Sequence, residues 1–190
     1  MERVYVVEKQ FEKIDVDHTP LTQGDYENCQ FINCNFLNAD LSGFHFADCE
    51  FISCNLSMAK LNKTAFKDIR FQNCKLLGLH FEKCDQFLFS VEFQDCILRL
   101  ASFFKMKLAK TKFKNSGLQE VDFAEADLNN SLFDKCDLSG AIFEHTNLEK
   151  TDFRTSFHYS IDPESNKIKK AKFSLLGITG LLEKYDIEVE

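Results

Sequence analysis

Residues 29–57, CQFINCNFLNADLSGFHFADCEFISCNLS, carry a large apolar side chain at every fifth position. This spacing matches neither an α-helix, with its period of 3.6, nor a strand, with its period of 2. Steps of five from Phe31 meet only Phe or Leu as far as Phe81. Two extra residues then interrupt the repeat, which we expect to resume at Leu88 and to continue to Phe153. The repeat covers most of the chain and therefore constrains its fold more than any other feature.

A second register of small residues lies two positions before the central Phe or Leu of each unit, as at Cys29, Ala39 and Thr111. Larger exceptions are Phe44, Leu79 and Met106, and the other three positions are mostly polar. Alternate residues of a strand point to the same face, so the small and the central residue can both point inward. The polar residue two positions further on must then lie at a corner. Short straight sides joined by regular corners close into a coil.

Taking every fourth central residue, starting from Phe31, gives a column that contains only Phe: Phe31, Phe51, Phe71, Phe93, Phe113, Phe133 and Phe153. The next column is nearly all Leu. This predicts four sides and twenty residues per coil, and roughly six to seven coils stacked about 4.8 Å apart. The fold class is therefore all-β, a quadrilateral parallel β-helix filled by Phe and Leu. Asn33, Asn73 and Asn115 recur at one corner, where Asn suits a turn.

The eight cysteines have three possible states: disulfides, metal ligands or free thiols. Five of them stand in line in the small-residue register, one per coil: Cys34, Cys54, Cys74, Cys96 and Cys136. Ligands along a line do not converge on a tetrahedral zinc ion. The chain shows neither a secretory signal nor a long apolar segment, so we expect a cytoplasmic protein with free, buried thiols.

Near-consensus units such as ADLSG at 39–43 and CDLSG at 136–140 resemble those of the pentapeptide-repeat proteins, over about residues 26–158. This resemblance implies a right-handed quadrilateral β-helix. Two segments resemble the quinolone-resistance (Qnr-like) branch: CDQFLFSVEFQDC at 84–96 and IDPESNKIKKAKFS at 161–174. Members of that branch are dimers joined near their C-termini that bind DNA gyrase or topoisomerase IV in place of DNA. Some carry projecting loops, whereas this chain has only two extra residues within its repeats.

We expect three regions: an N-terminal cap strand within 1–25, the repeat helix over 26–160 with a small break near 84–90, and a closing coil and cap over 161–190. VYVVEKQF at 4–11 is expected to be a strand over the first coil, because open strand edges recruit other chains. The last segment places Leu175, Ile178, Leu182 and Tyr185 at helical spacing, although Gly177 and Gly180 weaken a helix. The resemblance implies a homodimer formed there by Leu175, Leu176, Ile178, Leu181 and Leu182.

Charge is banded along the chain, whose net charge is −7. Residues 61–120 are rich in bases, including Lys105, Lys107, Lys110, Lys112 and Lys114, which could neutralise a neighbouring acidic coil. The expected partner-binding residues form an acidic band: Asp122, Glu125, Asp127, Asp134, Asp137, Glu144, Glu149 and Asp152. Such a band suits a protein partner that holds DNA, and it is equally the pattern of an ordinary solvated surface. Direct nucleic-acid binding is disfavoured, because it needs clustered bases.

No motif for catalysis, for a metal or for any other cofactor stands out. The five His residues lack metal-ligand spacing, the seven Gly residues form no phosphate-binding loop, and the filled core leaves no room for a substrate. Two hypotheses follow. The chain is a non-enzymatic DNA mimic that binds a type II topoisomerase and contributes to quinolone resistance, or it is an interaction scaffold for an unrelated partner.

Overall fold

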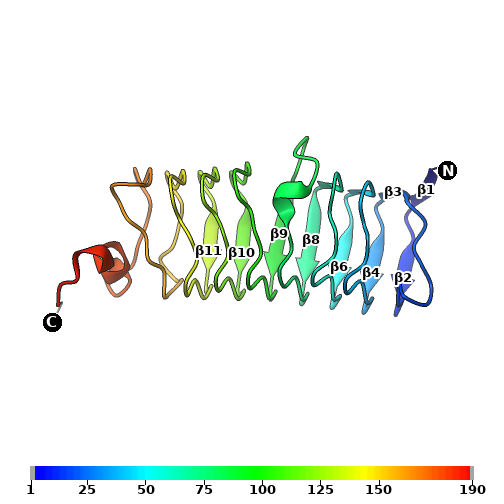
Figure 1. Ribbon diagram of the computed structural model, residues 1–190, viewed down its shortest axis with the longest axis horizontal. Helices are drawn as coiled ribbons and strands as arrows, with labels where there is room; N and C mark the ends of the chain where they lie inside the picture. The colour runs from blue at the N-terminus through cyan, green and yellow to red at the C-terminus, as the bar shows by residue number, and fades with distance from the viewer. Residues whose placement is uncertain (1–2, 189–190) are drawn as a thin grey trace.

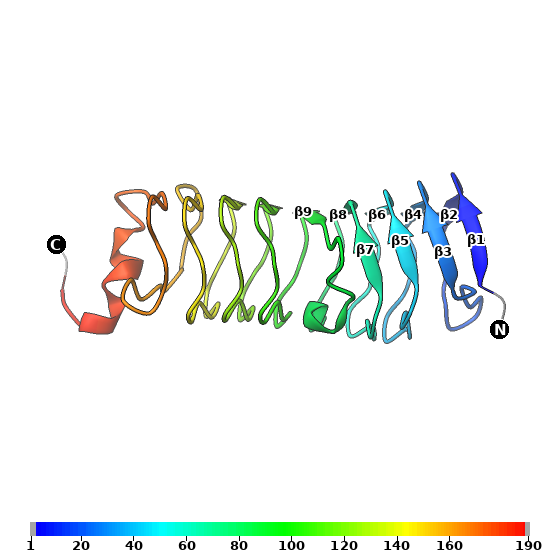
Figure 2. The same cartoon turned by 90° about the horizontal axis from the view of Figure 1, so that it is seen from above.

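The structure, a computed structural model, describes residues 3–188. The chain forms a stack of coils, and regular strands lie on two adjacent sides of this stack (Figures 1 and 2). One side is a seven-stranded parallel sheet: β2 (Gln10–Glu12), β4 (Gln30–Ile32), β6 (Glu50–Ile52), β8 (Ile69–Gln72), β9 (Val91–Gln94), β10 (Lys112–Lys114) and β11 (Leu132–Asp134). The second is a four-stranded parallel sheet: β1 (Val4–Val7), β3 (Gly24–Glu27), β5 (His45–Ala47) and β7 (Ala65–Lys67). The chain is a rod with its termini at opposite ends.

The other two sides are built from single bridges at the same register, such as Asn35 with Asn55 and Asp40 with Lys60. We number the sides in chain order: face 1 is the seven-stranded sheet, face 2 contains Asn35, face 3 contains Asp40, and face 4 is the four-stranded sheet. Pairing joins Phe31 to Phe51 and Phe113 to Phe133, so each coil uses twenty residues. The prediction of a parallel β-helix with six to seven four-sided coils is confirmed, and the structure has about seven turns.

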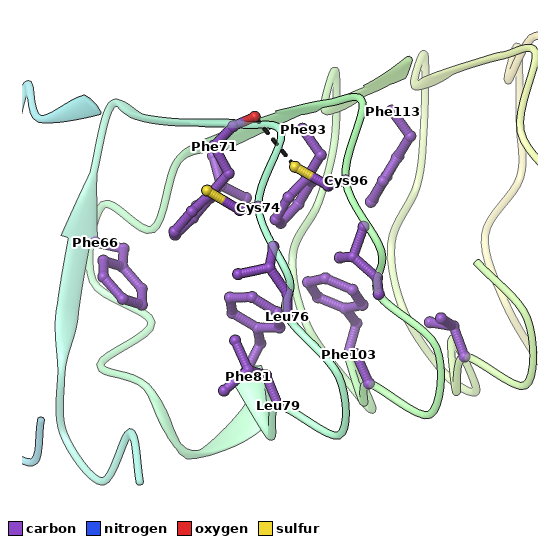
Figure 3. Close-up of a cluster of buried hydrophobic side chains, with 14 of the residues drawn as sticks. Phe66, Phe71, Cys74, Leu76, Leu79, Phe81, Phe93, Cys96, Phe103 and Phe113 are labelled. Atoms are coloured by element: carbon purple, nitrogen blue, oxygen red, sulfur yellow. Dashed lines mark hydrogen bonds between the residues drawn. The ribbon is translucent and has the colours of Figure 1, made fainter. Parts of the chain in front are cut away.

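Stacked aromatic rings fill the axis of the rod (Figure 3). On face 1, the ring of Phe113 lies 5.2 Å from Phe93 and 4.7 Å from Phe133, both nearly parallel to it. Phe103 on face 3 meets Phe93 edge-on at 5.9 Å. Like residues therefore stack along the rod while rings on facing sides meet edge to face, the two geometries that aromatic pairs prefer.

The small-residue register contributes hydrogen bonds as well as small size. The Cys74 thiol donates to the Phe51 carbonyl at 3.2 Å, and the Cys96 thiol donates to the Phe71 carbonyl at 3.3 Å (Figure 3). The hydroxyls of Thr64 and Ser131 bond in the same way to carbonyls of the preceding coil. Cys, Ser and Thr at this position thus satisfy backbone carbonyls that face the dry core.

All eight cysteines are buried and free, as expected from the sequence. Burial raises the pKa of Cys49 to about 12 and that of Cys136 to about 11, which keeps both as thiols at neutral pH.

The corner residue two positions after the centre takes the left-handed conformation, with φ of 53° at both Asn33 and Asn73 and 46° at Asn115. Gly43 and Gly140 stand at equivalent corners with φ of 71° and 67°. Asn and Gly tolerate this region best. Elsewhere Lys, Glu, Met and Leu are forced into it, because every side of the coil must end in a turn.

The break in the repeat lies between Asp85, which pairs with Ala65, and Val91, which pairs with Ile69. Here the expectation for Leu88 is wrong: its side chain is 56% exposed, because the two extra residues put it in the turn with φ of 59°. Phe89 packs inward instead, with its ring 6.5 Å from Phe66. Next to the short 3-10 helix η1 (Phe81–Lys83), this segment projects from the rod, and Phe87 within it is 78% exposed (Figure 1).

Both ends differ in detail from the expectation. Residues 4–11 form two strands, β1 and β2, rather than one, because the chain turns at Glu8 with φ of 52°. β1 pairs with β3, and Phe11 stacks on Phe31 at 4.9 Å, so this segment continues the coil. The C-terminal helical cap is two 3-10 helices, η2 (Ile178–Leu181) and η3 (Glu183–Tyr185).

Residues 1, 2, 189 and 190 of the expected terminal regions lie outside the described part of the chain, and the division into three domains stays a prediction. Within residues 3–188, no helix has the length and apolar character that a bilayer crossing needs.

Candidate protein-binding surface

The eight acidic residues of the predicted band surround the rod instead of lining one side. Asp134 and Asp152 lie on face 1, and Asp137 lies on face 2. Asp122 and Glu144 belong to face 3, whereas Asp127 and Glu149 belong to face 4. Glu125 stands at the corner between those two faces. The structure thus brings the band together along the axis and divides it among four sides.

Two of the eight carboxylates of the band are paired with Lys or Arg side chains. Glu125 meets Lys105 at 3.4 Å, and Asp152 meets Arg154 at 2.7 Å and Lys172 at 3.9 Å. The Arg154 guanidinium lowers the pKa of Asp152. Asp127 and Asp134 accept hydrogen bonds from Asn147 and Thr155. All of these neighbours except Arg154 stand about one coil away, so the repeat itself places a polar partner beside each of these carboxylates.

Asp137 has the strongest hydrogen-bond network of the band. Burial opposes its ionisation, but hydrogen bonds from Ser139, His158 and Gln119 outweigh it and lower the pKa of Asp137 to about 2. His158 Nδ1 lies 3.0 Å from the carboxylate and 3.2 Å from Ser139 Oγ. A hydrolase would bond serine and aspartate to opposite nitrogens of the ring. Here Ser139 and Asp137 both contact the same nitrogen, Nδ1 of His158. The three residues therefore stabilise the Asp137 carboxylate and do not form a catalytic triad.

The lysine run spirals around the middle of the rod. Lys105 and Lys110 stand at corners, Lys107 lies on face 4, and Lys112 and Lys114 lie on face 1 in β10. Lys112 pairs with Glu92 of the preceding coil at 2.6 Å. Together with the Lys105–Glu125 pair, this confirms that part of the run neutralises acids of neighbouring coils.

The expected dimer residues lie at the C-terminal end of the rod. Leu175 and Leu176 are 90% and 92% exposed, and Ile178 is also largely exposed. Leu181 and Leu182 are half-buried, and Leu181 packs against the end of the core. An open cleft of about 940 Å³ separates this segment from the last coil and is lined by Leu176, Phe157, His158 and Tyr159. The segment therefore covers the core with one side and leaves leucines on the other.

Two apolar features went unrecognised in the sequence: the projecting Phe87, and a set of exposed side chains on face 2. The set on face 2 breaks the rule that outward positions of the repeat are polar, and a search for Leu, Ile or Met at those positions would have found it. Phe87 lies in the break, where the repeat gives no rule.

A protein-family model described as the pentapeptide repeat region matches residues 24–86 and 80–153 of the sequence. The chain is a pentapeptide-repeat protein. No curated protein matches this pentapeptide-repeat protein in sequence. Pentapeptide-repeat proteins are generally non-catalytic structural or binding proteins.

Solved structures agree with the fold of this pentapeptide-repeat protein. A trypsin-treated form of QnrB1, described as a plasmid-mediated fluoroquinolone resistance protein, is 21% identical, with a TM-score of 0.63 and coverage of 99% of this chain and 98% of that chain. A second trypsin-treated form is 23% identical, with a TM-score of 0.57 and the same coverage. HetL, from the cyanobacterium Nostoc and involved in heterocyst differentiation regulation, is 12% identical, with a TM-score of 0.52 and coverage of 91% and 87%.

Proposed function

We propose that this protein binds a type II topoisomerase, DNA gyrase or topoisomerase IV, in place of DNA, and so contributes to quinolone resistance. The observation that supports this proposal most strongly is the density of negative charge along the rod at the acidic band. Residues 121–160 hold eight acids and three bases, a net charge of −5. They make two coils, or roughly 10 Å of rod. The result is about one net charge per 2 Å, close to the value of about 1.7 Å for duplex DNA.

The placement of these carboxylates on all four faces supports the same proposal. Duplex DNA presents phosphates around its whole circumference, and a protein that closes around DNA contacts several sides of it. A patch on one face would suit a flat interface better. The likeness to QnrB1 over nearly the whole of both chains adds support at the level of shape.

Dimerisation would lengthen the negative surface. We propose that Leu175, Leu176, Ile178, Leu181 and Leu182 join two copies at their C-terminal ends. Two adjacent leucines that are nine-tenths exposed are costly in water, and burying each stabilises a complex by about 2 kcal/mol. The acidic bands of both copies would then adjoin. We expect this dimer in the cytoplasm, where thiols stay reduced.

Gyrase supercoiling, titrated with the purified protein, tests the proposal. We expect inhibition that weakens as salt rises, because the contact is between charges. Glu144→Lys with Glu149→Lys should weaken inhibition at least tenfold, since it removes four units of net negative charge from the band. A control variant, Asp25→Lys with Glu27→Lys, makes the same charge change on face 4 near the N-terminus. Unchanged supercoiling at tens of micromolar protein would rule the proposal out.

The second candidate, a scaffold for an unrelated protein, is favoured by the basic middle of the rod. Residues 61–120 hold six acids and eleven bases, so the negative surface is interrupted there. HetL illustrates that this fold also occurs in a protein of differentiation regulation. A pull-down in which topoisomerase subunits are the main specific partner would count against the scaffold.

A further inference from the structure

Five exposed apolar side chains lie on face 2 or at its corner with face 3. This face 2 stripe consists of Leu37, Met58, Leu77, Ile97 and Leu100, each between 37% and 54% exposed. They come from four consecutive coils. A backbone hydrogen bond from the Met58 N–H to the Leu77 carbonyl joins two members in adjacent coils. The segments that carry the members are stacked in successive coils by the bridges from Asn35 through Asn55 and Lys75 to Ile97. Met58 also lies over the next coil, because its sulfur is 2.6 Å from where a Cβ on Gly78 would stand.

The charges around the face 2 stripe differ from those of the rest of the protein. The four segments that build this part of face 2, residues 35–38, 55–58, 75–78 and 97–100, contain no Asp or Glu in a chain whose net charge is −7. They do contain Lys75 and Arg99, and Lys60 stands just around the corner on face 3. Acids return at both ends, with Asp15 in the preceding coil and Glu120 in the following one.

The length of the stripe sets the size of what can cover it. Four coils at a spacing of about 4.8 Å span roughly 14 Å from first to last. A helix of about ten residues, close to three turns, has this length. The apolar side of an amphipathic helix repeats at i, i+3, i+4 and i+7 and would match one row of apolar side chains. Helices commonly pack on one face of a sheet in this manner.

We propose that the face 2 stripe is a docking surface for an acidic amphipathic helix of a protein partner. Its apolar side would cover Met58, Leu77 and Leu100, and its carboxylates would reach Lys75 and Lys60. A second copy of this chain suits the surface less well, because it would bring Lys75 and Arg99 against their own counterparts. Nucleic acid also suits it less well, since the centre is apolar and Arg99 is held by Glu120 at 2.7 Å.

This docking site is independent of the proposed binding to a topoisomerase. That function rests on carboxylates that would meet a basic surface, whereas the face 2 stripe requires an acidic one. The two surfaces can therefore be tested separately, and the failure of one leaves the other standing.

The test uses isotope-labelled full-length protein and a synthetic helical peptide of about fourteen residues, with Leu on one side and Glu elsewhere. Backbone amide shifts measured by NMR should change at residues 35–38, 55–60, 75–78 and 97–100. A peptide with Lys in place of every Glu should bind at least tenfold more weakly, because it meets Lys75 and Lys60 with like charge.

Met58→Glu with Leu100→Glu should weaken binding of the acidic peptide at least tenfold. Both residues stand at corners with φ of 58° and 60°, and Glu120 and Glu125 already occupy such corners with φ of 56°, so the variant retains its fold. The matched control, Asn130→Glu with Ile142→Glu, adds the same charge and removes an exposed apolar side chain elsewhere. No shift with millimolar acidic peptide, shifts outside face 2, or equal binding of the two variants would overturn the proposal.

Discussion

At the scale of single residues, stability depends on rings that are stacked above and below. Phe93 lies between Phe71 at 5.4 Å and Phe113 at 5.2 Å, and it also meets Phe81 and Phe103 edge-on. Truncation leaves a hole that the neighbouring coils cannot close, because their spacing is set by backbone hydrogen bonds.

We therefore expect Phe93→Ala and Phe113→Ala each to lower the free energy of unfolding by roughly 3–5 kcal/mol. Denaturant melts followed by circular dichroism measure this loss. Leu37→Ala, a truncation on the exposed surface, is the control and should cost less than half as much. A loss below 1 kcal/mol at both Phe positions would show that the core relaxes around the hole.

Asp137 makes stability depend on pH. Its pKa is about 2 in the folded protein, whereas an unfolded chain has about 3.9. A lowered pKa stabilises the fold above the unfolded value, and that contribution is lost as the pH falls from about 4 towards 2. Because the side chain is 26% exposed and screened by solvent, we expect only about 1 kcal/mol.

Asp137→Asn should therefore cost about 1 kcal/mol at pH 7 and clearly less at pH 2.5, where the wild-type carboxyl is partly protonated. Urea melts of both proteins at the two pH values give the comparison. An equal difference at both values would mean that the charge of Asp137 contributes nothing to stability.

At the scale of elements, the recurring corner is the strained part of each coil. Non-glycine residues in the left-handed region cost about 1–2 kcal/mol, and glycine there costs about 0.5–1 kcal/mol in chain entropy. Lys110 has φ of 68°, between the values of Gly140 and Gly43. The repeat accepts this cost at many corners, because burying each ring outweighs it.

Lys110→Gly should therefore raise the free energy of unfolding by about 0.5 kcal/mol. Lys114→Gly, in the adjacent strand β10, is the control and should lower it, since a strand gains nothing from a left-handed residue. Thermal melts of both variants measure the difference. Destabilisation by Lys110→Gly would indicate that the lysine side chain, and not its backbone strain, dominates at this corner.

At the scale of the whole molecule, the rod has unlike ends. The C-terminal segment packs Leu181 against the core and extends Leu175 and Leu176 into solvent, whereas β1 and β2 at the other end each pair on one side only. Association through the leucines would double the length of the rod about a two-fold axis.

We expect the protein to sediment at twice its chain mass of 22.0 kDa and Leu175→Glu with Leu176→Glu to sediment as a monomer with an unchanged circular-dichroism spectrum. Sedimentation equilibrium measures the mass. A monomeric wild-type protein at about 100 µM would contradict the dimer, since exposed leucines should associate well below that concentration.

Periodicity along the chain was enough to determine the coil. The side-chain direction of a strand, the polar residue at +2 and the column of Phe from Phe31 to Phe153 leave one four-sided arrangement, because burial of each ring depends only on its place in the repeat. The acidic residues of the band and the leucines of the expected dimer contact could also be selected from the sequence. Which faces they occupy and which side chains they contact depends on the path of the chain.

Only the tertiary structure decided which face each residue occupies and what stands beside it. Residues twenty apart in sequence lie next to each other, so Glu125 finds Lys105, and Leu37, Met58 and Leu77 form one surface although the sequence scatters them. At the break, backbone geometry gave the inward place to Phe89 over Leu88, because two extra residues shift the side-chain alternation. Local spacing determines burial, whereas contacts between coils determine charge pairing and surface pattern.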